Sequence, residues 1–244
     1  MALNRREFLG AAAAAVAVVA VAPGLHLIEL ALADTRQKEA SALRRWGLLI
    51  DTDKCSTGCN ACVTACNKVN GLLNHDNPET DPQWIRKVTL KDPETGYVQS
   101  LPVMCQHCAD APCVDVCPTG ASFKRADGIV LVDKHLCIGC RYCMMACPYK
   151  ARSFVAQKIT DQLPDVPRGM GTVEGCTLCV ERIDRGKIPA CVEACSQTDG
   201  KAMMFGDLKD KNSLIAKRLA NQPSTEIRPG LDLDTGVRYQ HLIL

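Results

Sequence analysis

The run from Cys137 to Pro148 constrains the fold more than any other part of the sequence. It reads Cys-Ile-Gly-Cys-Arg-Tyr-Cys-Met-Met-Ala-Cys-Pro, which is a C-x2-C-x2-C-x3-C-P spacing. In this spacing three thiolates on a tight turn hold one [4Fe–4S] cluster, and the fourth thiolate binds a different cluster. Pro148 ends the short helical turn that carries the fourth cysteine, because proline has no backbone N–H to donate. The motif therefore requires a second cysteine group elsewhere in the chain.

Three further groups of cysteines meet this requirement. All sixteen cysteines of the chain fall into four groups of four. The groups are Cys55, Cys59, Cys62 and Cys66; Cys105, Cys108, Cys113 and Cys117; Cys137, Cys140, Cys143 and Cys147; and Cys176, Cys179, Cys191 and Cys195. The first group departs from the common spacing, because three residues rather than two separate Cys55 from Cys59. No cysteine is left over, so we expect all sixteen to be iron ligands.

The N-terminus has the features of an export signal. Asn4-Arg5-Arg6-Glu7-Phe8-Leu9-Gly10 precedes an Ala/Val-rich run, and Ala31-Leu32-Ala33 gives an A-x-A cleavage pattern. Paired arginines followed by Phe-Leu indicate twin-arginine export to the periplasm, over a signal of residues 1–33. An ordinary secretory signal or an uncleaved anchor are the alternatives. No later stretch is apolar enough to cross a bilayer, so membrane attachment is expected through a partner or a retained signal.

The composition indicates what fills the interior of the protein and excludes one class of partner. Aromatic residues make up 4% of the chain, so inorganic clusters are expected to organise much of the interior in place of an aromatic core. The formal net charge is +2, which argues against a nucleic-acid-binding protein.

The order of the groups predicts an α+β fold of two ferredoxin-like modules, one inserted in the other, with long surface loops. Residues 121–125 and 128–133 flank an Asp127-Gly128 turn signal and predict a β-hairpin between groups two and three. The inserted module is expected over 93–153. The first module then comprises residues 34–92 together with 154–206. A strand is expected over 46–50 in its first part.

The remaining segments predict loops and a terminal helix. The polar inserts 67–90 and 157–175 are expected to be surface loops and candidate partner contacts. Residues 207–244 are expected to form a C-terminal helix and tail, with Leu214, Ile215 and Leu219 as a packing stripe.

Disulfides and zinc are the simpler explanations for so many cysteines. An exported protein meets an oxidising compartment, but four repeated groups of closely spaced thiols suit metal better than cross-links. Two C-x2-C pairs would be enough for a Zn–S4 site. Zinc leaves the x3-C-P extensions of groups two and three unexplained.

A third alternative concerns the first group alone. The Cys55-x3-Cys59-x2-Cys62 spacing also occurs in radical S-adenosylmethionine enzymes, which leave one iron without a protein ligand. Here Cys195 is available as the fourth ligand, and export would separate the protein from its cytoplasmic cosubstrate. No Ser/His/Asp array, phosphate-binding loop or nucleotide fingerprint is visible, so no catalytic residues are predicted.

Three other residues are weaker candidates for a functional role. His107 lies between Cys105 and Cys108, and we interpret it as a loop residue near a cluster rather than a ligand. His135 is interpreted as a surface residue at a strand end. Trp84 either anchors a partner or pins its own loop.

Over roughly residues 44–206 the chain resembles the four-cluster iron–sulfur subunits of bacterial respiratory complexes. The motifs are Cys105-Gln-His-Cys108 through Cys117-Pro-Thr-Gly120, the run at Cys137, and Cys176-Thr-Leu-Cys179 through Cys191-Val-Glu-Ala-Cys195. Such subunits serve dimethyl sulfoxide, polysulfide, thiosulfate and tetrathionate reductases. Within the family, the signal and the segments 168–175 and 234–239 are most similar to the DsrO type of DsrMKJOP complexes. Ser196 departs from the family pattern, which often has proline there.

The resemblance implies four [4Fe–4S] clusters whose ligands cross between groups. The implied sets are Cys55, Cys59, Cys62 and Cys195; Cys66, Cys176, Cys179 and Cys191; Cys105, Cys108, Cys113 and Cys147; and Cys117, Cys137, Cys140 and Cys143. It also implies a non-catalytic electron-transfer subunit of an oxidoreductase complex. It would have two partners. One is a multihaem cytochrome c, and the other is an NrfD-like membrane subunit that interacts with quinone. The alternative partner is a molybdopterin catalytic subunit.

Overall fold

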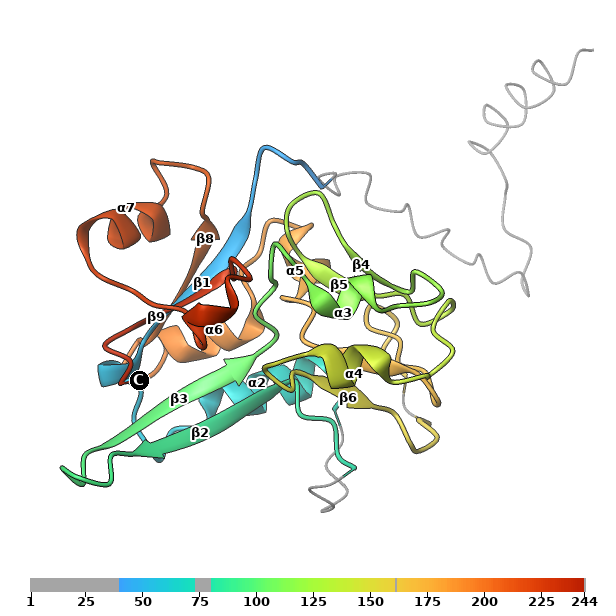
Figure 1. Cartoon of the computed structure of the whole chain (residues 1–244), viewed down its shortest axis with the longest axis horizontal. Coiled ribbons are helices and arrows are strands. Elements are labelled where there is room, and N and C mark those ends of the chain that lie inside the picture. The colour runs from blue at the N-terminus through green and yellow to red at the C-terminus, as the bar shows by residue number, and fades with distance from the viewer. Residues whose placement is uncertain (1–39, 73–79, 161, 244) are drawn as a thin grey trace, which may run out of the picture. The chain divides into compact units, whose positions relative to one another are not determined.

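The computed structural model describes residues 40–72, 80–160 and 162–243 (Figure 1). The signal predicted over residues 1–33 and its cleavage site lie outside these ranges. The described residues cluster as one unit. Among the described helices, none combines the length and the apolar character needed to span a membrane.

Strands from both ends of the described chain meet in one three-stranded sheet. Strand β1 (Trp46–Asp51) pairs antiparallel with β8 (Met203–Asp207) and parallel with β9 (Val237–Gln240). The strand predicted over 46–50 is therefore confirmed. Five consecutive residues of β1 are buried, as expected for a central strand covered on both faces. The expected C-terminal tail differs from the structure, because β9 lies in the core with Tyr239 fully buried.

Two pairs of short helices carry many of the cysteines. Helix α2 (Ala61–Asn70) packs against α6 (Ala190–Ser196), and these helices belong to groups one and four. Helix α3 (Pro112–Asp115) packs against α4 (Tyr142–Ala146), which belong to groups two and three. A 3-10 turn, η2 (Thr52–Lys54), leads into Cys55, and α5 (Val180–Ile183) follows Cys179.

The hairpin predicted between groups two and three is confirmed. Strand β4 (Ser122–Lys124) pairs antiparallel with β5 (Val130–Val132). Gly128 has a φ of +86° in the connecting turn, a conformation that glycine adopts without steric cost.

Two segments expected to be loops contain strands instead. Strand β2 (Ile85–Lys91) pairs with β3 (Val98–Met104) along the long hairpin at the lower left of Figure 1. Strand β6 (Arg152–Phe154) pairs with β7 (Val173–Gly175). The expectation of loops over 67–90 and 157–175 is thus wrong at these ends, because strands just outside the expected loops satisfy the backbone hydrogen bonds. The predicted module boundaries at 92/93 and 153/154 fall inside these paired elements.

The C-terminal segment adds a helix over the sheet. Helix α7 (Leu214–Asn221) begins at Ser213, whose hydroxyl accepts a hydrogen bond from the Ala216 N–H, and a 3-10 turn, η3 (Pro229–Leu231), precedes β9. Ile215 is fully buried, whereas Leu214 is 76% exposed. The predicted packing stripe therefore does not include Leu214.

Trp84 belongs to the core. It is 1% exposed and packs in the same cluster of buried residues as Leu48, Ile50 and Tyr239. A partner protein cannot contact a side chain that the rest of this chain covers. Trp84 therefore fixes the segment before β2 in place and does not anchor a partner.

Candidate iron–sulfur cluster sites

The first set of cysteines lines one cavity. Cys55, Cys59, Cys62 and Cys195 lie around it, with Lys87 from β2 on its wall. Burial, reinforced by the neighbouring Cys55 and less strongly by Cys195, raises the pKa of Cys62 to about 11. The fold thus brings the last cysteine of group four to the first three of group one, as the crossover pattern implies.

The second set lines a separate cavity beside the central sheet residue Leu48. Its cysteines are Cys66, Cys176, Cys179 and Cys191. Burial raises the pKa of Cys66, with Cys176 and Cys179 adding to the effect, and burial raises the pKa of Cys179 to about 11. The walls are otherwise mostly apolar, including Trp84 and Met104.

The third set is identified by the electrostatic neighbours of its members. Burial, with further contributions from Cys105, Cys113 and Cys147, raises the pKa of Cys108 to about 12. These four residues are the ligand set that crosses from group two to the last cysteine of group three. All four are buried.

The fourth set is the most exposed. Cys143 interacts electrostatically with Cys137 and Cys117 of the same set. Cys117 is only slightly buried, which raises its pKa a little, but hydrogen bonds from the Ser122 N–H and Thr119 outweigh this and lower it. Cys140 is exposed. The fold therefore brings three members together, and Cys140 follows Cys137 on the same loop.

Backbone N–H groups point at several of the sulfurs. The N–H groups of Ser122, Val173, Leu178 and Ala151 lie 3.3 Å, 3.4 Å, 3.4 Å and 3.5 Å from the Sγ atoms of Cys117, Cys137, Cys176 and Cys147. Hydrogen bonds to a charged acceptor stabilise the charged form, so these contacts favour thiolates. They also tune the potential of a bound iron–sulfur cluster.

The donors at these sites fit iron–sulfur chemistry. All sixteen cysteines lie in the described ranges and are free thiols, so no disulfide uses them. Over the same ranges, there is no group of three or more His, Cys, Asp or Glu side chains that could hold a single metal ion. Thiolates are the ligands that Fe–S clusters use. Because eight of these sixteen thiols have raised pKa values, metal binding would have to drive their deprotonation and would release protons.

The two histidines singled out in the sequence have structural positions. His107 is buried, and its Nδ1 atom accepts a hydrogen bond from the Val130 N–H at 3.0 Å. Burial first, and then the nearby Arg152, lower the pKa of His107 to about 3, so the ring stays neutral at physiological pH. His135 is exposed in the turn after β5, as expected.

Sequence reasoning missed two basic residues that contact the cysteine segments. Lys87 donates from Nζ to the carbonyl oxygens of Ser56 and Cys59. Arg152 donates from Nη2 to the Sγ atom of Cys113 at 3.2 Å. The only local signal was that Arg152 comes five residues after Cys147. Its burial depends on β7, which is distant in sequence.

Comparisons with known proteins agree with this chemistry. Two family models, each described as a 4Fe–4S dicluster domain, match residues 54–121 and 96–208. The chain is 40% identical to the "Hdr-like menaquinol oxidoreductase iron-sulfur subunit 1" of Archaeoglobus fulgidus, over 98% of both chains. It is 38% identical to a tetrathionate reductase subunit of Salmonella typhimurium, over 80% of this chain and 73% of the relative. It is 39% identical to "Protein NrfC" of Escherichia coli, over 74% of this chain and 73% of that protein.

The mixed helix and strand architecture and the thiol-lined sites define an iron–sulfur protein of the ferredoxin-like 4Fe–4S class. Within this class, the chain belongs to the family of [4Fe–4S] electron-transfer subunits that includes those of dimethyl sulfoxide and tetrathionate reductases.

Proposed function

We propose that the chain holds four [4Fe–4S] clusters, one in each of the four ligand sets. The observation that supports this most directly is that the fold gathers cysteines of different groups, with Cys195 beside Cys62 and Cys147 beside Cys108. The packing of α2 on α6 and of α3 on α4 supports two nested ferredoxin-like modules. Iron and acid-labile sulfide in anaerobically purified protein should each approach about sixteen per chain, since each of the four cubes holds four of each.

The four sites form a series. Cys62 of the first set interacts electrostatically with Cys191 and Cys66 of the second. Cys176 of the second set interacts with Cys105 of the third. Cys143 of the fourth set in turn interacts with Cys113 of the third. Electrons can therefore pass from the first site through the second and third to the fourth, and the protein fixes the spacing.

The fourth site is the proposed point of exchange with a partner. Around the exposed Cys140, Ile138 is 66% exposed, Tyr142 53% and Met145 67%. Large apolar side chains exposed together mark interaction surfaces. A redox partner that covers them would bring its own cofactor close to this cluster.

The chain then acts as a relay subunit in a membrane-associated respiratory complex. The name of the Archaeoglobus relative, a menaquinol oxidoreductase subunit, supports exchange with a quinone-interacting membrane partner of NrfD-like type. We propose a periplasmic location, reached by twin-arginine export, and a multihaem cytochrome as the second partner. The physiological setting would be a DsrMKJOP-type complex of dissimilatory sulfur metabolism.

A second candidate is the electron-transfer subunit of a molybdopterin oxidoreductase. The similarity to the tetrathionate reductase subunit of Salmonella typhimurium favours it. In that setting the chain would carry electrons between a membrane partner and a molybdenum subunit that acts on a sulfur compound.

Gentle affinity purification of the membrane-bound complex separates the two settings. Co-purification of a cytochrome c and an NrfD-like protein is expected for the first, and of a molybdenum subunit for the second. The relay proposal fails if the isolated chain turns over a substrate with neither a partner nor an artificial electron carrier.

A further inference from the structure

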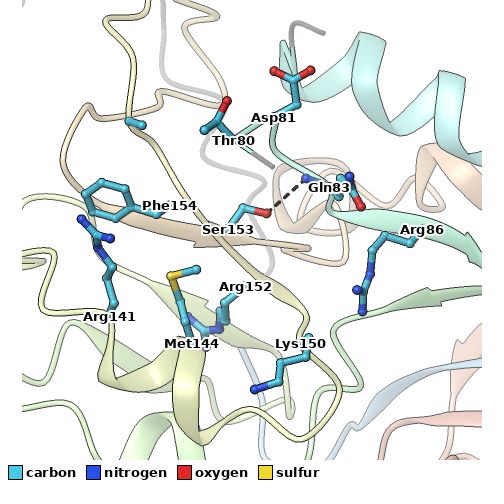
Figure 2. Close-up of a pocket in the computed structure, with 11 residues that line it drawn as sticks. Thr80, Asp81, Gln83, Arg86, Arg141, Met144, Lys150, Arg152, Ser153 and Phe154 are labelled. Carbon is cyan, nitrogen blue, oxygen red and sulfur yellow. Dashed lines mark hydrogen bonds between the residues drawn. The ribbon is translucent and has the colours of Figure 1, made fainter. Parts of the chain in front are cut away.

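Arg152 places a buried positive charge between two of the cysteine sets. It opens β6, five residues after Cys147, and is 8% exposed. Its Nη2 atom donates to the Sγ atom of Cys113 at 3.2 Å and to the Ser122 hydroxyl at 3.0 Å. One side of Arg152 lines the pocket that also contains Met144 of α4 (Figure 2).

The guanidinium has no carboxylate partner among the described residues. Its Nη1 atom is buried and makes no hydrogen bond to the protein there. Burial by itself lowers the pKa of Arg152, and the nearby sulfurs of Cys113, Cys105 and Cys143, in that order, raise it. Removing a buried charge from water is costly unless an opposite charge lies close. Cysteine thiolates are therefore the counter-charge that this cation has.

The contacts are unequal between the two sets. Two of the three sulfurs, Cys113 and Cys105, belong to the third set, and within the described part of the chain the hydrogen bond of Arg152 to sulfur goes to Cys113. Cys143 is the single member of the fourth set that Arg152 reaches. A charge at this position acts more strongly on the third site than on the fourth.

We propose that Arg152 raises the reduction potential of the third cluster, held by Cys105, Cys108, Cys113 and Cys147, relative to its neighbours. This inference rests on the proposed clusters. The cluster gains one electron from a reduced neighbouring cluster, and its negative charge grows by one. A nearby buried cation and a hydrogen bond to a ligand sulfur both stabilise that added charge. Arg152 stays protonated throughout, so no proton accompanies the electron.

The consequence is an electron-holding position inside the series. The third site lies between the second and the fourth, because Cys176 neighbours Cys105 and Cys143 neighbours Cys113. A raised potential there lets the chain keep an electron in its interior, away from the exposed Cys140, until a partner at the fourth site can accept it.

The test is a redox titration of the anaerobically purified full chain, followed by electron paramagnetic resonance. In Arg152→Gln we expect the equilibrium constant for reduction of one cluster to fall at least tenfold, which equals about 59 mV for one electron. Cys108→Ser changes a ligand of the third cluster and so identifies its signal. The signal that moves in Arg152→Gln should be the one altered in Cys108→Ser.

Arg86→Gln is the matched control. Arg86 lines the same pocket (Figure 2), but its Nη2 atom donates to the carbonyl oxygen of Tyr149. Its removal should leave the midpoints unchanged. A fully loaded Arg152→Gln chain with unchanged midpoints, or with a shift confined to another signal, overturns the inference while the four clusters stand. Low iron in the unaltered chain would instead overturn the proposed function.

Arg152→Lys covers the case in which the glutamine variant loses iron. The ammonium keeps the positive charge but not the planar fork of donors. We expect a loaded third cluster whose reduction constant stays within tenfold of the unaltered chain. A loaded Arg152→Lys chain with a tenfold or greater fall would show that the charge does not set the potential.

Discussion

The Nζ atom of Lys87 lies 3.0 Å from the carbonyl oxygen of Cys59. The same ammonium donates to the carbonyl oxygen of Ser56 at 2.8 Å, so one side chain from β2 holds both sides of the irregular turn between Cys55 and Cys59. It also lowers the pKa of Cys62, although burial dominates and the net direction is upward. The extra residue in this group is thus held by a side chain distant in sequence.

Replacing Lys87 should therefore weaken the first cluster selectively. In Lys87→Met the two carbonyl groups lose their shared donor and the thiolates lose a nearby cation. Iron should fall from about sixteen towards about twelve per chain, as expected when one cube of four irons is lost. Lys91→Met, an exposed position at the end of the same strand, should keep the full content. Full iron in both variants would contradict this role.

Gly139 should tolerate no side chain. Its φ is +71°, and a Cβ atom built there would lie 2.1 Å from the carbonyl oxygen of Gly171. The Cys137–Cys140 loop therefore packs directly on the backbone before β7. Gly139→Ala should lower the melting temperature of the holoprotein, followed by visible cluster absorbance, because both the backbone strain and the clash act against the native state.

Gly58→Ala is the control for that variant. Gly58 also lies between two cysteines of a group, but a Cβ atom there meets nothing within 4 Å. Its melting temperature should match that of the unaltered chain. Equal melting temperatures for both alanine variants would show that the Gly139 loop can move away from Gly171.

The buried ion pair between Arg168 and Glu174 should be important for stability. Arg168 donates to both carboxylate oxygens, at 2.7 Å and 3.0 Å, and its Nη1 donates to the Gly71 carbonyl oxygen at the end of α2. The Glu174 side chain is 0% exposed. Glu174→Gln leaves a buried cation without its counter-charge. We therefore expect the free energy of unfolding to fall by about 3–5 kcal/mol.

The half-exposed Glu193, which pairs with Arg182, provides the comparison. Glu193→Gln should cost less than about 1 kcal/mol, as is usual for surface pairs. Chemical denaturation of the two variants side by side measures the difference. If both variants lost the same small amount, the Arg168 pair would be replaceable by a neutral hydrogen bond.

The paired arginines of the N-terminal segment should control export. Replacing Arg5 and Arg6 together with lysine keeps the charge and removes the twin-arginine signature. We expect cluster-loaded precursor to remain in the cytoplasm after cell fractionation, whereas the unaltered chain reaches the periplasm. Unchanged export would indicate the general secretory route and argue against cluster assembly before export.

Several features could be predicted because they depend on neighbours in sequence. The spacing of Cys137, Cys140 and Cys143 predicts three ligands of one cluster, since a tight turn brings these thiols close together. The Asp127-Gly128 turn predicts the β4–β5 hairpin, because the turn conformation needs a glycine. The apolar run from Trp46 to Ile50 predicts β1 by its composition. The family resemblance, based on local motifs, is likewise confirmed.

Other features depended on contacts between distant segments. Parallel pairing of β1 with β9 joins residues almost 190 positions apart, such as Leu48 and Val237, and nothing local to either strand specifies it. The burial of Trp84 follows from the same packing. In the sequence, Arg152 is an ordinary charged residue that follows the Cys137–Pro148 motif. Only the folding of β6 against β7, with Ser122 and Cys113 beside it, removes its charge from water and directs it at sulfur. The sequence alone thus predicted the sixteen candidate iron ligands and the turns that carry them, whereas tertiary packing decided which charges act on these thiols, because electrostatic effects depend on burial and distance.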